Sequence, residues 1–249
     1  MIISISGRIG SGKDTVGKII QYLTSEVDQR NNLPFIITDD YSGNWQIKKF
    51  AYKLKEICSI LTGIPIEDFE KQEVKDRLLG EEWAFDKEFS RNSDTIQDSD
   101  WVQYKRKIPT VRWLLQTVGT DAMRDKVHED IWINALFADY TGKRGCENRC
   151  KRSIEADTPE HECVLPKYCY DQKFPNWIIT DTRFPNELEA IKKRNGISIR
   201  LQKETDKEEG HISETALDLA KFDYIVNNDG TIEELIDKIK EILIKEKII

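Results

Sequence analysis

The chain has 249 residues, 39% of them hydrophobic, enough to bury one α/β core or two small ones. Its formal net charge of -7 offers no general attraction to nucleic acid or to an anionic membrane, so we expect a small ligand met by local cations. No stretch reaches the roughly 20 apolar residues of a membrane span, and no basic leader begins the chain. These features predict a cytoplasmic protein with no membrane partner.

The first third of the chain begins with a strand and a helix. The apolar run 2–6 predicts a buried strand, and the residues after it repeat apolar side chains at helical spacing (Val16, Ile19, Ile20, Leu23, Val27). A second short apolar run, 34–38, precedes a helical segment from about Ala51 to Leu61, which Gly63 and Pro65 end. The pattern therefore opens with a strand, a loop and a helix.

The middle of the chain lacks strong strand patterns. Residues 66–108 are charged and weakly periodic, which predicts helices and loops packed over a core and not a central sheet. From Val111 to Tyr140 the apolar spacing is helical again, and we expect two helices broken near residues 118–120.

The last third of the chain alternates strands with helices. Residues 177–180, 197–201 and 224–226 are short β-prone runs, and Ile232 to Leu243 form one apolar helical stripe. Strands that alternate with helices predict a parallel sheet covered on both faces, and hence an α/β fold of three layers.

The loop between the first strand and the first helix has the spacing of a phosphate-binding P-loop. Gly7, Gly12 and Lys13 match its pattern, with Gly10 and Ser11 between them. Such glycines let backbone N–H groups wrap phosphates, the lysine reaches the terminal ones, and the helix dipole attracts anions. A glycine-rich turn with a solvated lysine is the alternative.

Asp14 departs from that pattern, which places Ser or Thr after the lysine to bind Mg²⁺. Asp14 can hold the ion through a water or act on the substrate side, and Thr15 supplies a hydroxyl one residue later. The alternative is a carboxylate that the helix dipole stabilises without any role in chemistry.

A second polar group follows the strand at 177–180. Asp181 ends this run and Arg183 comes two residues later, so parallel strands place both near the P-loop. The carboxylate can orient Mg²⁺ waters or an attacking hydroxyl, and the guanidinium can hold phosphate bidentately. An Asp–Arg pair at a strand-to-helix turn is the alternative.

The chain has no Asn-Lys-x-Asp element, which excludes a GTPase of the usual kind.

Several motifs together resemble the bacteriophage deoxynucleoside monophosphate kinases. The resemblance covers most of the chain apart from roughly 66–108 and 143–175. It depends on motifs that occur in the same order: Gly10-Ser-Gly-Lys-Asp-Thr15, Val111-Arg112-Trp-Leu-Leu-Gln116 with Gly119-Thr120-Asp121, Asp130-Ile-Trp132, Asp181-Thr-Arg183, His211-Ile-Ser213-Glu214 and Val226-Asn-Asn-Asp-Gly230.

The resemblance implies a P-loop kinase of the nucleoside monophosphate kinase type. The implied fold is a three-layer P-loop NTPase domain over 1–249, with a parallel five-stranded sheet, a helical acceptor-binding region at about 51–140 and a lid at about 203–221. The implied reaction moves the γ-phosphoryl group of ATP, with Mg²⁺, onto a deoxynucleoside monophosphate. The family also implies a homodimer.

The resemblance also implies roles for individual residues. Asp14 suits a kinase whose acceptor is itself a phosphate, because an extra carboxylate helps to orient Mg²⁺ between two anionic reactants. The implied donor-binding residues are Gly10, Ser11, Gly12, Lys13, Asp14 and Thr15, with Asp14, Thr15 and Asp181 toward Mg²⁺. The implied acceptor-site residues are Lys55, Arg112, Gly119, Thr120, Trp132, Arg183 and Glu187. Of these, Trp132 is alternatively a core aromatic residue.

One departure from the family concerns the lid. Relatives place an arginine just after the preceding strand, whereas this chain has Gln202 and Lys203, so Lys203 or Arg200 is the expected replacement. His211 is either a hydrogen-bonding lid residue or a helix cap.

The segment at about 143–175 contains four of the five cysteines of the chain. Cys146, Cys150, Cys163 and Cys169 can close a tetrahedral Zn²⁺ site that orders a long insertion. A surface loop with free, reduced cysteines is the alternative.

Two other functions remain open at the level of sequence. Another small-molecule P-loop kinase, such as one for dephospho-coenzyme A, would share the phosphate loop and the Asp-x-Arg element but not the segment from Arg112 to Trp132. A non-enzymatic nucleotide-binding module is the other alternative. The sequence does not predict the preferred base of the nucleotide.

Overall fold

The computed structural model describes residues 1–25, 35, 44–89, 103–144, 172–203 and 216–249. The chain divides into two compact units, one made of Met1–Phe50 and Ile133–Ile249 and the other of Ala51–Trp132. The first unit contains the phosphate loop, and the second contains most of the predicted helical region. Among the described residues, no helix has the length and apolar character needed to cross a bilayer.

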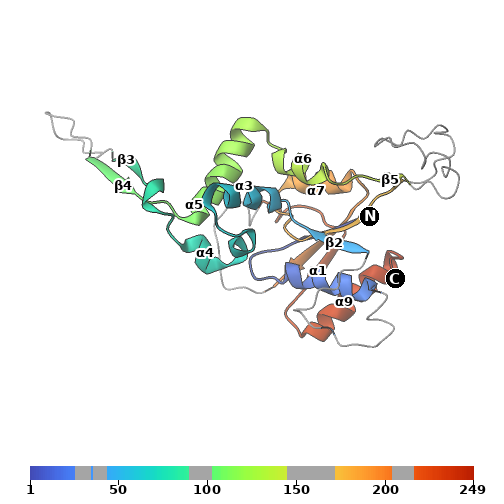
Figure 1. The fold of residues 1–249 in the computed structure, drawn as a ribbon. Helices are drawn as coiled ribbons and strands as arrows, with labels where there is room; N and C mark the ends of the chain where they lie inside the picture. The colour runs from blue at the N-terminus through green and yellow to red at the C-terminus, as the bar shows by residue number, and fades with distance from the viewer. Residues whose placement is uncertain (26–34, 36–43, 90–102, 145–171, 204–215) are drawn as a thin grey trace, which may run out of the picture. The chain divides into compact units, whose positions relative to one another are not determined.

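A parallel sheet forms the centre of the first unit (Figure 1). In the described part of the chain, the sheet has five strands in the order β2-β7-β1-β8-β9. The strands are β1 (Ile2–Ser6), β2 (Trp45–Lys48), β7 (Asn176–Ile179), β8 (Ile197–Gln202) and β9 (Tyr224–Asn227). The predicted parallel five-stranded sheet is confirmed, and its second strand lies at Trp45–Lys48. The apolar run 34–38 lies outside the described residues except for Phe35.

Strand β1 lies between β7 and β8, although both of these strands come far after β1 in the sequence. Ile3 pairs with Ile178 on one side and with Ile197 on the other. All five residues of β1 are buried, as expected for a strand at the centre of a covered sheet. The carboxyl ends of β1 and β7 therefore lie next to each other, which is the edge where α/β proteins bind ligands.

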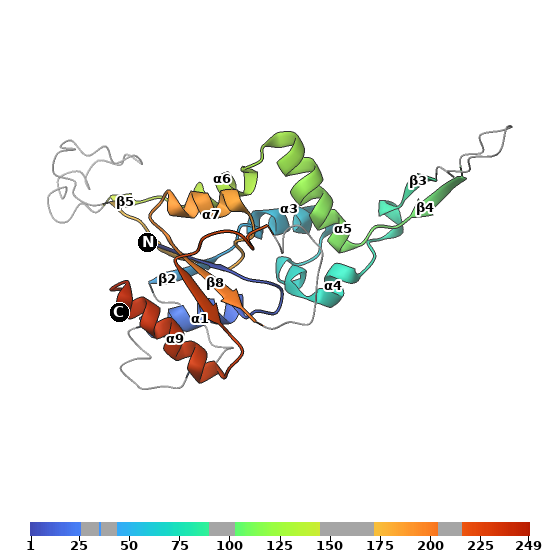
Figure 2. The ribbon, with the colours of Figure 1, turned by 180° about the vertical axis from the view of Figure 1, so that it is seen from behind.

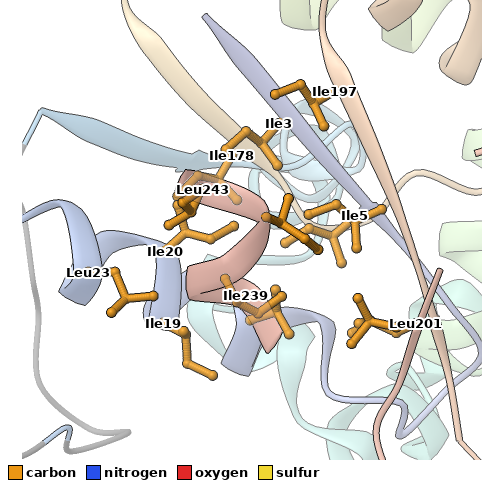
Figure 3. Packing of buried hydrophobic residues seen from close by; sticks show 14 of the residues in the cluster. Ile3, Ile5, Ile19, Ile20, Leu23, Ile178, Ile197, Leu201, Ile239 and Leu243 are labelled. Atoms are coloured by element: carbon orange, nitrogen blue, oxygen red, sulfur yellow. The ribbon is translucent and has the colours of Figure 1, made fainter. Parts of the chain in front are cut away.

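Two helices cover one face of this sheet with apolar stripes. Helix α1 (Lys13–Thr24) presents Ile19 and Ile20, and helix α9 (Ile232–Lys245) presents Ile239 and Leu243. These side chains are at most 8% exposed and pack against the strand side chains Ile3, Ile5, Ile178, Ile197 and Leu201 (Figure 3). Burial of each such side chain stabilises the fold by about 1.5–3 kcal/mol, which anchors the start of α1 beside β1.

The other face of the sheet is covered by α7 (Pro185–Lys192) and by the part of α6 (Ile131–Phe137) from Ile133 onward (Figure 2). Ile2 and Ile179 pack here against Ile191 and Phe137. The first unit therefore has the three layers that the sequence predicts. A short antiparallel pair, β5 (Lys143–Arg144) and β6 (Gln172–Lys173), lies on either side of residues 145–171 in the sequence.

The second unit is mainly helical and has a core of its own. Cys58, Phe69, Val111 and Leu114 form the centre of this core, and each is at most 5% exposed. Its elements are α3 (Tyr52–Thr62), η1 (Ile66–Glu70), α4 (Gln72–Asp76), η2 (Glu81–Trp83), β3 (Phe85–Phe89), β4 (Gln103–Lys107), α5 (Val111–Gln116) and the π-helix η3 (Thr117–Val127). The expectation of helices and loops holds for most of 66–108, but it missed the antiparallel hairpin of β3 and β4.

The expected helix break near residues 118–120 is wrong. Helix α5 continues directly into η3, and the helical stretch ends before His128. Gly119 is buried inside this stretch, where a Cβ atom would lie 2.8 Å from Leu54 Cδ2 of α3. The glycine thus permits close packing of two helices and does not end one.

Candidate active site

The phosphate loop joins the end of β1 to the first residue of α1. Gly10 and Gly12 have φ angles of 78° and 92°, a left-handed region that glycine adopts without strain. Gly12 is the N-cap residue of α1, and no side chain caps this helix end. The first N–H groups and the dipole of the helix therefore face the loop, an arrangement that favours an anion.

The Lys13 side chain folds back over this loop. Its Nζ donates to the backbone oxygen of Gly7 at 2.8 Å and to that of Arg8 at 2.7 Å. The ammonium group is thus held at the loop by two neutral carbonyl groups. Thr15 is the third residue of α1 and is half-buried.

Asp14 connects the start of α1 to two neighbouring strands. Its Oδ1 accepts a hydrogen bond from Thr180 Oγ1 at 2.7 Å and lies 3.2 Å from Lys49 Nζ. Thr180 follows β7 and Lys49 follows β2, so both belong to the same edge of the sheet as the phosphate loop. The Asp14 side chain is nevertheless 67% exposed and accessible to a ligand.

The turn after β7 carries Asp181 and Arg183. Asp181 Oδ1 accepts the backbone N–H of Phe50 at 2.8 Å, which joins this turn to the residues after β2. Arg183 is half-exposed, and its backbone N–H is bonded to Glu187.

Glu187 is buried at the start of α7, next to the turn that carries Arg183. Its side chain is 2% exposed, and its Oε2 accepts the backbone N–H groups of Arg183 at 2.8 Å and Phe184 at 3.1 Å. A carboxylate at this position satisfies the free N–H groups at the start of α7. Glu187 therefore shapes the turn that presents Arg183, and its place in the acceptor site stays a prediction.

Two of the predicted cations of the second unit form ion pairs there. Lys55 Nζ lies 2.6 Å from Glu70 Oε1, and its side chain is 11% exposed. Arg112 donates from Nε at 3.0 Å and from Nη2 at 2.9 Å to Asp76 Oδ1. The hydrogen bond from Arg112 holds the pKa of Asp76 below its usual value. This pair fixes the direction of the Arg112 guanidinium on α5.

Gly119, Thr120 and Trp132 lie in the same unit. Trp132 is 5% exposed and its indole N–H donates to the backbone oxygen of Gly119 at 2.9 Å. This arrangement favours the core alternative for Trp132, because its ring is buried and its polar atom is satisfied. Thr120 is exposed beside the buried Gly119.

A pocket of about 330 Å³ borders the phosphate loop on the side of β8. Its lining includes Arg8, Arg200, Lys203, Asp218 and Phe222. Arg200 donates to Ser6 Oγ at 2.9 Å and to Asp218 Oδ1 at 2.6 Å, and its side chain is 11% exposed. Arg8 lies 3.4 Å from the other oxygen of Asp218. The Arg200 side chain therefore links β8 to Ser6 of β1 and to Asp218. Lys203, the first residue after β8, is exposed.

Comparison with known proteins supports the relationship that the motifs indicate. A family model described as deoxynucleotide monophosphate kinase matches residues 161–239. The deoxynucleotide monophosphate kinases of Escherichia phage RB69 and Enterobacteria phage T4 are 24% and 25% identical over 135 residues, or 54% of this chain. The deoxynucleoside-5'-monophosphate kinase of Escherichia phage T5 is 25% identical over 231 residues, or 80% of this chain. The resemblance to phage deoxynucleotide monophosphate kinases is confirmed.

The matches differ in how much of each relative they cover. The chain spans 45% of the length of the RB69 and T4 kinases and 74% of that of the T5 kinase. The family model reaches only the last part of the chain, which contains the Asp181-Thr-Arg183 turn and the strands β8 and β9. The phosphate loop is therefore supported by its own geometry, independently of the family model.

Two features that the motifs predicted lie outside the described residues. Cys146, Cys150, Cys163 and Cys169 belong to residues 145–171, and most of the lid at 203–221, with His211, belongs to residues 204–215. The zinc site and the closing lid therefore stay predictions. In the described part of the chain, no group of three or more His, Cys, Asp or Glu side chains is placed to hold a metal ion.

Sequence analysis gave no role to three residues that contact the phosphate loop. Lys49 and Thr180 contact Asp14, and Asn228 contacts the backbone of Ser11. None of them belongs to the P-loop pattern. The shared signal is position, because each is the first residue after a strand of the parallel sheet.

Proposed function

We propose that this chain is a deoxynucleoside monophosphate kinase. It transfers the γ-phosphoryl group of ATP to the 5'-phosphate of a deoxynucleoside monophosphate and yields ADP and the diphosphate. The observation that carries the proposal is the contact between the phosphate loop and the end of β7, where Thr180 holds Asp14. The phage relatives bear the name of this activity.

The donor phosphates bind at the loop of residues 10–15. Backbone N–H groups at the start of α1 surround them, and the Lys13 ammonium group compensates charge on the β- and γ-phosphates. Support comes from the left-handed Gly10 and Gly12 and from the position of Lys13 Nζ at the loop carbonyls. Phosphate oxygens are stronger acceptors than these neutral carbonyl groups, so Lys13 turns to them on binding.

The oxygen ligands at this site fit Mg²⁺, which favours carboxylates, hydroxyls and phosphates. Asp14, Thr15 and Asp181 would hold it, with Asp14 fixed by Thr180 and Asp181 by the Phe50 N–H. When bound, Mg²⁺ neutralises charge on the transferring phosphate. Lys49 stabilises the Asp14 carboxylate at 3.2 Å and adds a positive charge at the same edge.

Arg183 and Arg112 are the arginines that the family resemblance assigns to the acceptor phosphate. Glu187 fixes the turn that carries Arg183 in the first unit, and α5 carries Arg112 in the second unit. Lys55 and the Thr120 hydroxyl group line the acceptor region of that unit. Gly119 and Trp132 support this region through the hydrogen bond between them.

The chemical step needs charge neutralisation more than proton transfer. An oxygen of the acceptor monophosphate attacks the γ-phosphorus of ATP while the bond from that phosphorus to the β–γ bridging oxygen breaks. The acceptor oxygen is already anionic and requires no strong base. Catalysis therefore comes from positioning and from the surrounding cations.

The proposal extends to the setting of the enzyme. We propose a homodimer in the cytoplasm of an infected host, acting on free nucleotides and not on nucleic acid, with Lys203 in place of the lid arginine. The net charge of -7 supports action on free nucleotides and not on nucleic acid. The exposed position of Lys203 after β8 supports its assignment as the lid cation. Light scattering after gel filtration tests the dimer.

The deciding experiment measures ADP release with ATP, Mg²⁺ and each of the four deoxynucleoside monophosphates. Ribonucleoside monophosphates and dephospho-coenzyme A are tested in parallel, with Lys13→Ala as the inactive control. The proposal predicts turnover with at least one deoxynucleoside monophosphate. Turnover with dephospho-coenzyme A alone would identify a different P-loop kinase, and ATP binding without any turnover would identify a binding module.

A further inference from the structure

We infer that Asn228 is a positioning residue for the donor phosphates, because it fixes the direction of one peptide group in the phosphate loop. The inference rests on the proposed function, which makes this loop the ATP site. Asn228 lies in the turn after β9, and its Nδ2 donates to the backbone oxygen of Ser11 at 2.9 Å. The two residues are 217 positions apart in the sequence.

The hydrogen bond determines where the next N–H points. In a trans peptide the C=O and the N–H lie on opposite sides of the C–N bond. Because the Ser11 oxygen points to Asn228, the N–H of Gly12 points the opposite way, away from Asn228. If this peptide group rotated by half a turn, a carbonyl oxygen would replace that N–H and would repel an anion.

The conformational freedom of Gly12 makes a hydrogen bond that fixes this peptide group necessary. Its φ of 92° is open to glycine alone among ordinary residues without strain, and the same freedom allows the neighbouring peptide groups to rotate easily. A Cβ atom at position 12 would lie 2.7 Å from Asn228 Nδ2. The amide group of Asn228 therefore occupies the space that a side chain at residue 12 would need.

Asn228 is itself held in place. Its backbone N–H donates to the backbone oxygen of Gln202 at 2.8 Å, which ties the turn to the end of β8. Lys238 Nζ of α9 donates to the backbone oxygen of Asn227 at 2.8 Å. A rigid turn can hold the loop peptide in one orientation before ATP arrives, which lowers the entropy lost on binding.

The test compares Asn228→Ala and Asn228→Asp with Asn227→Asp. The first two remove the donor, and the aspartate keeps the shape of the side chain. Asn227→Asp adds the same charge one residue away on an exposed side chain. Calorimetry measures the Kd of ADP and of a deoxynucleoside monophosphate for each protein, together with the thermal midpoint.

We expect Asn228→Ala to bind ADP about five- to tenfold more weakly, the range set by one lost hydrogen bond, with an unchanged Kd for the monophosphate. Asn228→Asp should bind ADP at least as weakly, because its carboxylate also faces the Ser11 oxygen. Asn227→Asp should stay within about twofold of wild type for both ligands. Equal ADP affinity in wild type and the Asn228 variants would overturn the inference and leave the proposed function intact. If the affinity for ADP, the affinity for the monophosphate and the thermal midpoint all fell together, the inference would also be overturned, since that result indicates a purely structural role. A wild-type chain that binds no ADP or ATP would refute the proposed function and the inference with it.

Discussion

Asp14 is the residue for which the structure gives the sharpest prediction. Asp14→Asn removes the negative charge but keeps an oxygen that can accept the Thr180 hydroxyl at 2.7 Å. If the carboxylate orients Mg²⁺ between the two phosphates, kcat should fall by about 10²-fold or more, equivalent to at least about 2.7 kcal/mol of barrier. The loss should be largest at low Mg²⁺ concentration.

The same substitution should have a small effect on stability. Loss of a first-turn carboxylate from the dipole of α1 costs about 0.3–1 kcal/mol. Loss of the ion pair with Lys49 costs about 0.2–1 kcal/mol, because the Asp14 side chain is 67% exposed. The free energy of unfolding should therefore change by at most about 2 kcal/mol, which moves the thermal midpoint by a few degrees.

The assay is steady-state ADP release across a Mg²⁺ titration, with the thermal midpoint measured on the same samples. Glu233→Gln is a matched control, because Glu233 is an acidic residue in the first turn of α9, another helix of the first unit. This control should lower the midpoint by the amount that the dipole contribution alone sets, about 0.3–1 kcal/mol in the free energy of unfolding, and leave kcat unchanged. Normal turnover of Asp14→Asn at low Mg²⁺, with only the small midpoint shift, would refute the metal-orienting role and leave Asp14 as a dipole-stabilised carboxylate.

Three further predictions concern other groups. Lys13→Ala should lower kcat by at least about 10²-fold while circular dichroism shows a folded chain, since the Lys13 ammonium group is hydrogen-bonded to loop carbonyl groups; turnover near wild type would contradict the P-loop assignment. Arg112→Ala and Arg183→Ala should each raise the KM for the monophosphate more than the KM for ATP, and the reverse order in initial-rate kinetics would move these arginines to the donor side. Burial raises the pKa of the Cys58 thiol to about 11, so this cysteine stays protonated at pH 8 and peptide mass spectrometry should find it alkylated only after denaturation.

The sequence predicted the elements whose apolar pattern is long or whose ends carry a local signal. Strand β1 has the predicted bounds, and α9 has the predicted apolar stripe with Thr231 capping its start. Gly63 ends α3 in the left-handed conformation that makes glycine a common helix terminator. These features depend on neighbours in the chain, so sequence spacing is sufficient to find them.

Other elements depend on contacts that spacing does not encode. Strand β2 has only four residues and pairs with one neighbour, β7, which lies more than a hundred residues later. The pairing of β3 with β4 joins two charged segments across a gap of more than ten residues. At Gly119 the local signal predicted a break, and packing against Leu54 made the same residue part of a continuous helical stretch. In each case a distant segment decides the outcome.

The loop after β1 shows how a parallel sheet brings residues from separate segments of the chain together. Gly7 follows β1, Lys49 follows β2, Thr180 follows β7 and Asn228 follows β9, and each is the first residue after its strand. Because parallel strands end at the same edge of the sheet, residues separated by 166 positions (Thr180 and Asp14) and by 217 positions (Asn228 and Ser11) come within hydrogen-bonding distance. The P-loop pattern identifies only the first of these segments. Once the strands are known, the residue after each strand is therefore the place to search for the other groups that hold the phosphate loop. By the same rule Lys203, which follows β8, is a better candidate for the lid cation than Arg200, whose guanidinium is already bonded to Ser6 and Asp218 within the first unit.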